Sequence, residues 1–299
     1  MTDESSVGRP FAGLSFERIE SFLAVADAGG IAKAAPGNPS RQSQLSRQIR
    51  ELGEALGFEL TARRGRNVEL TPDGLRVQAL FRELSSSLDA MKRERASAPV
   101  RLTLAAGDSV LRWVVLPSLH QALADDGRVE LSLSAVTQGY VSVRDGVFDM
   151  AISKARKRED GMKRARIGTL RYALFAPRAI YKRWAARRAL GDLPFVCVTG
   201  APDLMQAFEE RVGAPRVALR CETFPQAALA VRSGHYAALL PALAAQEFSS
   251  GSTVALELDG LTALDLPLVL VARERRLEAV PAFAVFFDAL AKRLASALS

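Results

Sequence analysis

The run SRQSQLSRQIREL, Ser40 to Leu52, decides how the N-terminal part of this sequence folds. Leu45, Ile49 and Leu52 recur at intervals of four and three residues, which places them on one face of an α-helix. Asn38-Pro39 stands just before the run and predicts a turn, because the residue before a proline avoids the helical conformation. The pattern predicts an amphipathic helix that Ser40 caps and that Gly57 interrupts.

Two helices are expected before this one. Ser15 is a suitable N-cap for the first, which carries apolar residues at helical spacing: Phe16, Ile19, Phe22, Leu23 and Ala26. Gly29-Gly30 ends it, and a short second helix over 31–35 stops at Pro36-Gly37. Residues 1–14 contain few apolar anchors and are expected to form a disordered tail.

Two short extended pieces follow the third helix, around 58–60 and 68–70, with a turn-like basic loop at 63–67 between them. Three helices and a two-stranded hairpin are the outline of a winged helix-turn-helix domain, here over 15–73. Thr71-Pro72 then opens a long helix, since proline suits the first helical position. This linker helix, within 74–98, has one apolar side: Val77, Leu80, Phe81, Leu84, Leu88 and Met91. That side fits either a dimer seam or packing on the winged domain alone.

Strands and helices alternate from residue 99 onward, which predicts an α/β fold with parallel sheets covered by helices. The alternation falls into two blocks, so we expect two Rossmann-like, periplasmic-binding-protein-like lobes in residues 99–299. The first lobe is assigned about 99–171 and 273–299, and the second about 172–272. Ligands of such folds bind where the carboxyl ends of strands meet, so a ligand site is expected between the lobes.

Composition limits the chemistry that the chain can perform. The 299 residues include two cysteines, Cys197 and Cys221, and two histidines without ligand spacing, so neither a disulfide framework, a metal site nor histidine-based catalysis is expected. No phosphate-binding glycine loop is present, and no cofactor is predicted. The N-terminus resembles no signal peptide and no apolar run is long enough to span a membrane, so a cytoplasmic location is expected.

The net charge of +7 is concentrated in one stretch. Lys154 to Arg188 contains thirteen basic and two acidic residues, and the remainder of the chain is net acidic. Total charge therefore does not identify a DNA-binding domain. The basic stretch is read as a solvated surface, with an accessory DNA contact as the alternative.

The third helix carries the clearest functional pattern. Its face opposite the apolar stripe presents Arg41, Gln42, Ser43, Ser46, Arg47 and Arg50. Arginine and glutamine can make paired hydrogen bonds to guanine and adenine edges in the major groove. The loop after it adds three arginines that could hold phosphates in a wing: Arg63, Arg64 and Arg66. An ordinary solvated helix face is the competing interpretation.

Several segments resemble the N-terminal domain of LysR-type transcriptional regulators: Phe22 to Gly30, Ser46 to Leu52, Leu56-Gly57 and Leu70 to Gly74. The likeness covers about residues 15–95, and the remainder is similar in layout. It implies a homodimer or homotetramer that binds double-stranded DNA and senses a small effector. By position, Gln42, Ser43, Ser46 and Arg47 match the recognition-helix residues of the family, and Arg63 matches its wing arginine.

Turns after the strands of the second half supply small polar side chains: Ser109, Thr137, Gln138, Thr199 and Thr223. In similar regulators such turns line the effector site, and hydroxyls with backbone N–H groups at helix starts suit a carboxylate or another anion. The alternative is that these residues only cap helices. Two other classes of protein are the alternatives: a two-lobed small-molecule-binding protein without a DNA role, and a serine hydrolase suggested by Gly107-Asp-Ser109. The hydrolase lacks a suitably placed histidine.

Overall fold

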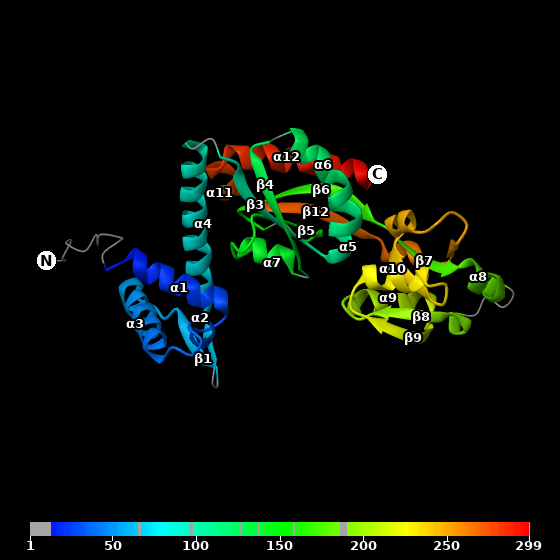
Figure 1. Cartoon of the computed structure of the whole chain (residues 1–299), viewed down its shortest axis with the longest axis horizontal. Helices are drawn as coiled ribbons and strands as arrows, with labels where there is room; N and C mark the ends of the chain where they lie inside the picture. The colour runs from blue at the N-terminus through cyan, green and yellow to red at the C-terminus, as the bar shows by residue number, and fades with distance from the viewer. Residues whose placement is uncertain are drawn as a thin grey trace. The chain divides into compact units, whose positions relative to one another are not determined.

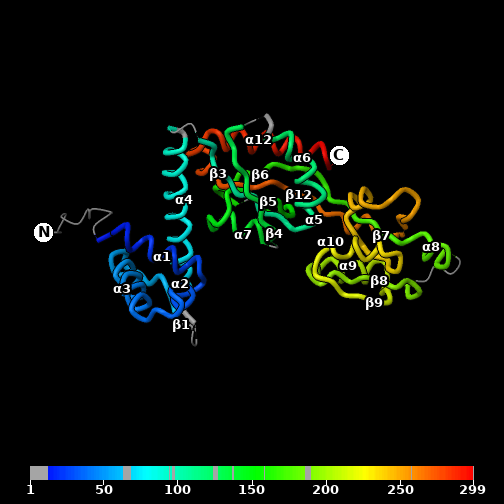
Figure 2. Tube along the Cα trace, viewed as in Figure 1, coloured from blue at the N-terminus to red at the C-terminus, as the bar shows by residue number. Residues whose placement is uncertain are grey.

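The computed structural model describes residues 13–64, 67–95, 98–125, 127–136, 138–157, 159–185, 190–256 and 258–298. Within this part, the chain divides into two compact units (Figures 1 and 2). Residues up to Arg95, with Arg144–Val147, form the N-terminal unit, and the remainder forms the second unit. The predicted tail lies almost entirely outside the described residues, which begin at Gly13.

The N-terminal unit contains the three helices, hairpin and long helix that the sequence predicts. These are α1 (Phe16–Ala28), α2 (Ile31–Ala34), α3 (Pro39–Leu56), β1 (Thr61–Arg64), β2 (Asn67–Leu70) and α4 (Pro72–Arg95). The stripe of α3 is buried together with Phe22 and Val25 of α1 in one hydrophobic core. Burial of such side chains stabilises the fold by about 1.5–3 kcal/mol each.

The start of α3 differs from the prediction. Asn38, not Ser40, is the N-cap, and its side chain accepts a hydrogen bond of 3.0 Å from the backbone N–H of Arg41. Pro39 occupies the first helical position, where its missing N–H costs nothing. Ser15 holds the N-cap position of α1, but its side chain makes no capping hydrogen bond.

The hairpin begins three residues later than predicted. Gly57 ends α3 with φ of 82°, and the N–H groups of Gly57 and Phe58 both donate to the carbonyl of Gly53. The hydrogen bonds that close α3 thus extend to Phe58, and the chain pairs as a strand only from Thr61. The strands β1 and β2 then pair antiparallel, from Thr61 opposite Leu70 to Arg64 opposite Asn67.

The second unit contains two five-stranded mixed sheets. The first has the order β4-β3-β5-β12-β6, and the second β11-β7-β10-β8-β9. The first lobe comprises β3 (Val100–Ala106), α5 (Asp108–Val110), the π-helix η1 (Leu111–Val115), α6 (Leu116–Asp125), β4 (Val129–Ala135), α7 (Gly139–Arg144), β5 (Met150–Lys154), β6 (Met162–Leu170), β12 (Leu266–Arg273), α11 (Glu274–Ala279) and α12 (Pro281–Ala297).

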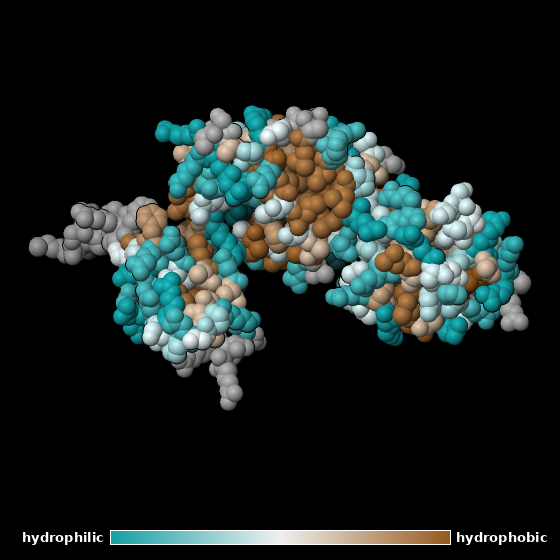
Figure 3. Space-filling model, in the orientation of Figure 1, coloured by the Kyte–Doolittle hydropathy of each residue, from teal (hydrophilic) through white to brown (hydrophobic). Residues whose placement is uncertain are grey.

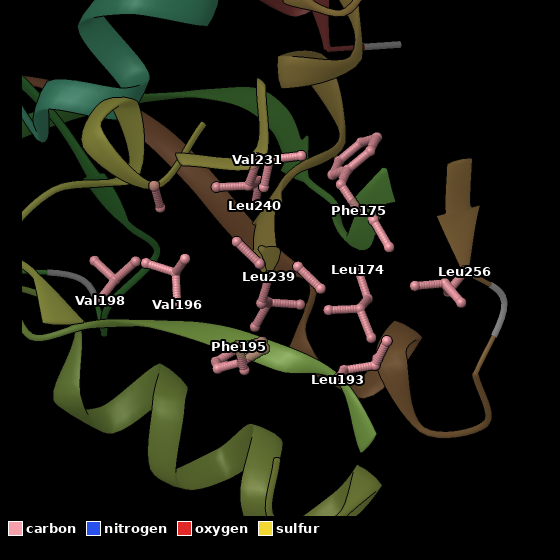
Figure 4. Close-up of a cluster of buried hydrophobic side chains, with 14 of the residues drawn as sticks. Leu174, Phe175, Leu193, Phe195, Val196, Val198, Val231, Leu239, Leu240 and Leu256 are labelled. Carbon is pink, nitrogen blue, oxygen red and sulfur yellow. The ribbon is translucent and has the colours of Figure 1, made fainter. Parts of the chain in front are cut away.

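The second lobe comprises β7 (Tyr172–Pro177), α8 (Arg178–Ala185), η2 (Leu190–Asp192), β8 (Pro194–Val198), α9 (Pro202–Val212), β9 (Arg216–Cys221), α10 (Phe224–Arg232), β10 (Ala237–Pro241), η3 (Ala242–Glu247), β11 (Thr253–Leu256) and η4 (Leu261–Leu264). Its core gathers side chains from β7, β8, β10 and β11, among them Leu174, Phe195, Leu239 and Leu256 (Figure 4).

The sheets are mixed and not wholly parallel, and one strand was assigned to the wrong lobe. The sequence placed residues up to 272 in the second lobe, whereas β12 pairs antiparallel with β5 and β6 in the first. The chain therefore crosses between the lobes at Arg171 and again at Asp265. Leu170 and Leu266 lie on the first-lobe side of these crossings and pair with each other. Six of the eight residues of β12 are buried, which explains its continuous apolar sequence.

Two elements within the basic stretch were not predicted: β6 and α8. Strand β6 is an edge strand of its sheet, with Met162, Ile167 and Leu170 buried between more exposed lysine and arginine side chains. Charged residues are unusual in central strands but are common on edges, where they discourage pairing with another chain. Part of the basic stretch is thereby a solvated sheet edge, as the sequence suggested.

The junction of the hairpin with α4 has no room for an additional methyl group. A Cβ added at Gly74 would lie 2.1 Å from the backbone oxygen of Leu60, and the Gly74 N–H donates to the Thr71 hydroxyl. The substitution Gly74→Ala should lower the stability of the N-terminal unit by about 1–3 kcal/mol, because the backbone must move apart. Calorimetric melting measures this loss.

The matched control is Gly127→Ala, since a Cβ at Gly127 meets nothing within 4 Å. Both tryptophans of the chain, Trp113 and Trp184, belong to the second unit, so the tryptophan-fluorescence transition should be unchanged in Gly74→Ala. An unaltered calorimetric profile would contradict the packing argument.

Candidate nucleic-acid interface and effector-binding residues

The face of α3 opposite its buried stripe is open to solvent. Arg41, Ser43, Ser46, Arg47 and Arg50 are exposed, and Gln42 is half-buried. The Arg47 and Arg50 side chains are 63% and 70% exposed. Ser43, Ser46, Arg47 and Arg50 thus share the solvent-facing side of the helix. Arg41, four residues before Leu45, lies on the side of the apolar stripe and is exposed in the first turn of the helix.

Weak local contacts hold several of these side chains. The Arg47 guanidinium lies 3.9 Å from Glu51, and that of Arg50 lies 3.5 Å from Glu54. Such exposed pairs contribute about 0.3–0.5 kcal/mol, so a stronger phosphate or base partner can displace them. The amide of Gln42 is more firmly held, because it donates 2.8 Å to the backbone oxygen of Ala35.

A buried polar network behind this surface was not predicted. Gln48 is buried on the inner side of α3, where its Oε1 accepts from the Ser21 hydroxyl at 2.6 Å and its Nε2 donates to Glu17 at 2.7 Å. These bonds link α3 to α1 and fix the rotation of the helix. Position 48 lies three residues after Leu45 and directly before Ile49, so the helical spacing in the sequence could have predicted that Gln48 is on the buried side of the helix.

The wing arginines stay a prediction. Arg63 and Arg64 lie in β1, but the described part of the structure does not include their side chains, and Arg66 lies outside the described residues altogether. The hairpin backbone itself is present between α3 and α4.

The predicted effector residues follow neighbouring strands in each lobe. Ser109 lies in α5 after β3 and is buried, while Gln138 follows the adjacent strand β4. Thr199 and Thr223 follow β8 and β9, which also pair. Thr137 lies outside the described residues. The structure thus forms two pairs, one in each lobe, and α5 of the first lobe contacts α10 of the second.

The two threonine hydroxyls already make hydrogen bonds. Thr199 donates to the Cys221 carbonyl at 3.0 Å, and Thr223 accepts from the backbone N–H of Gln226 in a capping box at the start of α10. Helix capping, the alternative interpretation from the sequence, is therefore observed for Thr223. A role in effector binding at these positions stays a prediction.

A contact between the lobes was missed by the sequence. Trp113 of η1 is only 3% exposed and belongs to the core of the second lobe, although η1 is a first-lobe element. Its Nε1 and the Arg112 Nε both donate 2.5 Å hydrogen bonds to Glu247 of η3. A π-helix turn such as η1 is rare and rotates the side chains that follow it, which no helical-period analysis anticipates.

The Glu247 carboxylate is held in its charged form. Burial raises its pKa, but hydrogen bonds from Arg112 and Trp113 and the charges of Arg112 and Arg232 outweigh this and keep the pKa below its usual value. The same pairing raises the pKa of Arg112, chiefly through its hydrogen bond to Glu247. Glu247 therefore links the lobes as a carboxylate at neutral pH.

The cysteines pack as small side chains at the edge of the second core. Both are free and half-buried, and burial raises the pKa of the Cys221 thiol. No cluster of three or more potential metal ligands occurs among the described residues. In the same part of the chain, no helix is both long and apolar enough to cross a bilayer.

Comparison with known proteins agrees with this architecture. Residues 16–75 match the family model for "Bacterial regulatory helix-turn-helix protein, lysR family", and residues 96–295 match that for "LysR substrate binding domain". The chain belongs to the LysR family, which consists of transcriptional regulators and not of enzymes. The family supports neither the hydrolase nor the binding protein without a DNA role.

Individual relatives are distant. The HTH-type transcriptional repressor PA14_22550 of Pseudomonas aeruginosa is 27% identical over 161 residues, which are 52% of this chain and 50% of that protein. The chain thus spans about half the length of this curated relative. Full-length LysG of Corynebacterium glutamicum with bound effector Arg has a TM-score of 0.65 and 19% identity, with 94% of this chain and 98% of that chain covered. CbnR complexed with its target DNA has a TM-score of 0.59 and 21% identity, with coverage of 94% and 100%. At these identities the likeness concerns the fold.

Replacement of the linking carboxylate should weaken the second unit in a pH-dependent way. Glu247→Gln should lower its free energy of unfolding by about 1–2 kcal/mol at neutral pH, since charge-assisted hydrogen bonds are lost. The pKa of Glu247 is lower in the folded than in the unfolded protein. The stabilisation is therefore complete above the unfolded value of about 4.3 and disappears as the pH falls through the native pKa.

Urea unfolding followed by tryptophan fluorescence measures this difference across the acidic range. Glu209→Gln, at an exposed position of α9, is the control and should match the wild type at each pH. A difference between Glu247→Gln and wild type that persists unchanged at low pH would refute the assignment.

Proposed function

We propose that this protein is a sequence-specific DNA-binding transcriptional regulator whose activity responds to a small effector. The observation that carries the proposal is the solvent-open face of α3, on which arginine and serine side chains stand opposite a fully buried apolar stripe. An α-helix of this kind fits the major groove, where its side chains can reach base edges. The arginines of the wing, at 63, 64 and 66, would add phosphate contacts.

The linker helix α4 supports pairing of two subunits. Val77 and Phe81 are buried against the N-terminal unit, but Leu80, Leu84, Leu88 and Met91 are between 43% and 60% exposed on the same helix. A row of large apolar side chains in water is unfavourable and is relieved when two such helices pack together. A dimer would present two copies of α3 to half-sites about 34–36 Å apart.

Effector binding is proposed for the second unit, at Ser109, Gln138, Thr199 and Thr223, with Thr137 as a further candidate. Support comes from their position at the carboxyl ends of strands in both lobes and from the contact between α5 and α10. The effector bound to LysG is arginine; for this chain we propose a small, anionic ligand. It would regulate only by binding two arrangements of the lobes with different affinities. Because its target is genomic DNA, we propose that the protein acts in the cytoplasm.

Arg47→Ala tests the reading of DNA bases. The operator is first obtained by selecting host-genome fragments that the purified protein retains. Loss of one paired base contact should then reduce the preference for the operator over a scrambled duplex by about tenfold, because such a contact discriminates by about 1–3 kcal/mol. Gel-shift titrations at several salt concentrations measure it.

Arg101→Ala is the control, since it removes the same charge from an exposed arginine outside the N-terminal unit. It should leave site preference unchanged. If Arg47→Ala lowers affinity equally for both duplexes, Arg47 contacts phosphate only; if neither preference nor affinity changes, α3 is not the recognition element.

The double substitution Leu84→Glu, Leu88→Glu tests the pairing of α4. Four charges buried at the centre of a paired seam are strongly unfavourable, so the protein should sediment as a smaller species or dissociate at least about tenfold more readily. Analytical ultracentrifugation measures the mass. Asp89→Asn, an exposed change on the same helix, should leave it unaltered. An unchanged mass for the double variant would refute α4 as the seam.

A further inference from the structure

A cavity of about 500 Å³ lies at one end of the second lobe, away from every residue assigned to a function above. Its wall is formed by α8, η2 and the first residues of β8 and β9: Ile180, Arg183, Trp184, Asp192, Pro194 and Arg216. All six belong to one lobe, so the shape of the cavity does not depend on how the lobes are arranged.

The cavity lies at the amino ends of β8 and β9, whereas the predicted effector residues of this lobe follow the carboxyl ends of the same strands. Pro194 and Arg216 are the first paired residues of β8 and β9, whereas Thr199 and Thr223 follow the last residues of these strands. Five residues of extended chain separate the two ends of the strands by about 16 Å. The cavity is therefore a second site and not an extension of the first.

Three charged side chains line the cavity without neutralising one another. Arg183, Asp192 and Arg216 are exposed, and none of them makes an ion pair within 4.0 Å in the described part of the chain. Two guanidinium groups and one carboxylate leave one net positive charge. Guanidinium groups suit the planar oxygens of carboxylates and phosphates, to which they donate two hydrogen bonds at once.

The wall also contains a hydrogen-bond donor without an acceptor. Trp184 is only 6% exposed, and its indole Nε1 is buried with no partner among the described residues. The other tryptophan differs, since Trp113 Nε1 donates to Glu247. An unpartnered buried N–H is unfavourable, and an oxygen brought into the cavity would satisfy it once the indole turned towards that oxygen.

We propose that this cavity binds a small organic oxyanion that also carries a hydroxyl or amino group. Its carboxylate or phosphate lies between Arg183 and Arg216 and accepts the hydrogen bond of the Trp184 indole. Its hydroxyl or amino group donates to Asp192. Binding at this site requires neither DNA nor a ligand between the lobes.

The two indole N–H groups of the chain provide the test. Full-length protein labelled with ¹⁵N-tryptophan gives two indole signals, one for each tryptophan, and Trp184→Phe identifies them. Inorganic phosphate, malate and succinate are titrated at constant ionic strength, with sodium chloride as the blank. The Trp184 signal should move and saturate, towards the position of a hydrogen-bonded indole, while the Trp113 signal stays fixed.

Variants then identify the groups that bind. Arg183→Ala and Arg216→Ala should each weaken binding by at least about tenfold, the effect of losing a charge-assisted pair. Arg220→Ala is the matched control, because it lies on the same strand but donates to Cys197 and not into the cavity. Malate should bind more tightly than succinate, which lacks the hydroxyl, and Asp192→Asn should reduce that preference.

Three results would overturn the proposal: a Trp184 signal that no probe moves, movement that sodium chloride reproduces, or movement that persists unchanged in Arg216→Ala. Tighter binding of phosphate than of malate would identify the ligand as a phosphate ester. The reverse order would identify a hydroxy acid. The measurement contains no DNA, so failure of the proposed regulatory function would not alter it.

Discussion

Burial of one side of α3 controls what the N-terminal unit can do. Leu45, Ile49 and Leu52 pack into the core with Phe22, and Gln48 adds a hydrogen bond to Ser21 behind them. These contacts fix the rotation of the helix about its own axis. Arg47 and Arg50, on the opposite side of the helix, consequently face solvent. Specific DNA recognition requires such a fixed surface, because a base contact made by a freely rotating helix would discriminate little.

The second unit consists of two lobes with few connections along the chain. Each lobe has its own five-stranded sheet, and in the described part of the chain the backbone passes between them at Arg171 and at Asp265. Around these crossings Tyr172 is partly buried, and this burial, with the nearby charge of Asp265, raises the pKa of its hydroxyl to about 12. Trp113 and Glu247 supply a further contact from side chains. Hydrophobic surface over α6 also faces solvent on the first lobe, where Leu116 is exposed (Figure 3).

Basic charge is a poor guide to function in this chain. The most basic stretch, Lys154 to Arg188, supplies the edge strand β6, the strand β7 and the helix α8, and so spreads over both lobes. The N-terminal unit has a lower net positive charge, but it places Arg47 and Arg50 on the solvent-facing side of one helix. Geometry, and not total charge, distinguishes the two.

The sequence by itself determined the winged helix-turn-helix, the long α4 and the alternating α/β order, because helical and strand periods and glycine or proline stops act over a few residues. It also determined that Ser43, Ser46, Arg47 and Arg50 of α3 face outward. Tertiary structure alone decided the rest. Residue 38 caps α3 where a serine was expected, β12 joins the first sheet, β6 is a strand despite its charges, and Trp113 enters the neighbouring lobe. Each of these depends on a partner distant in sequence or on a backbone geometry such as the π-turn, and no local pattern carries that information.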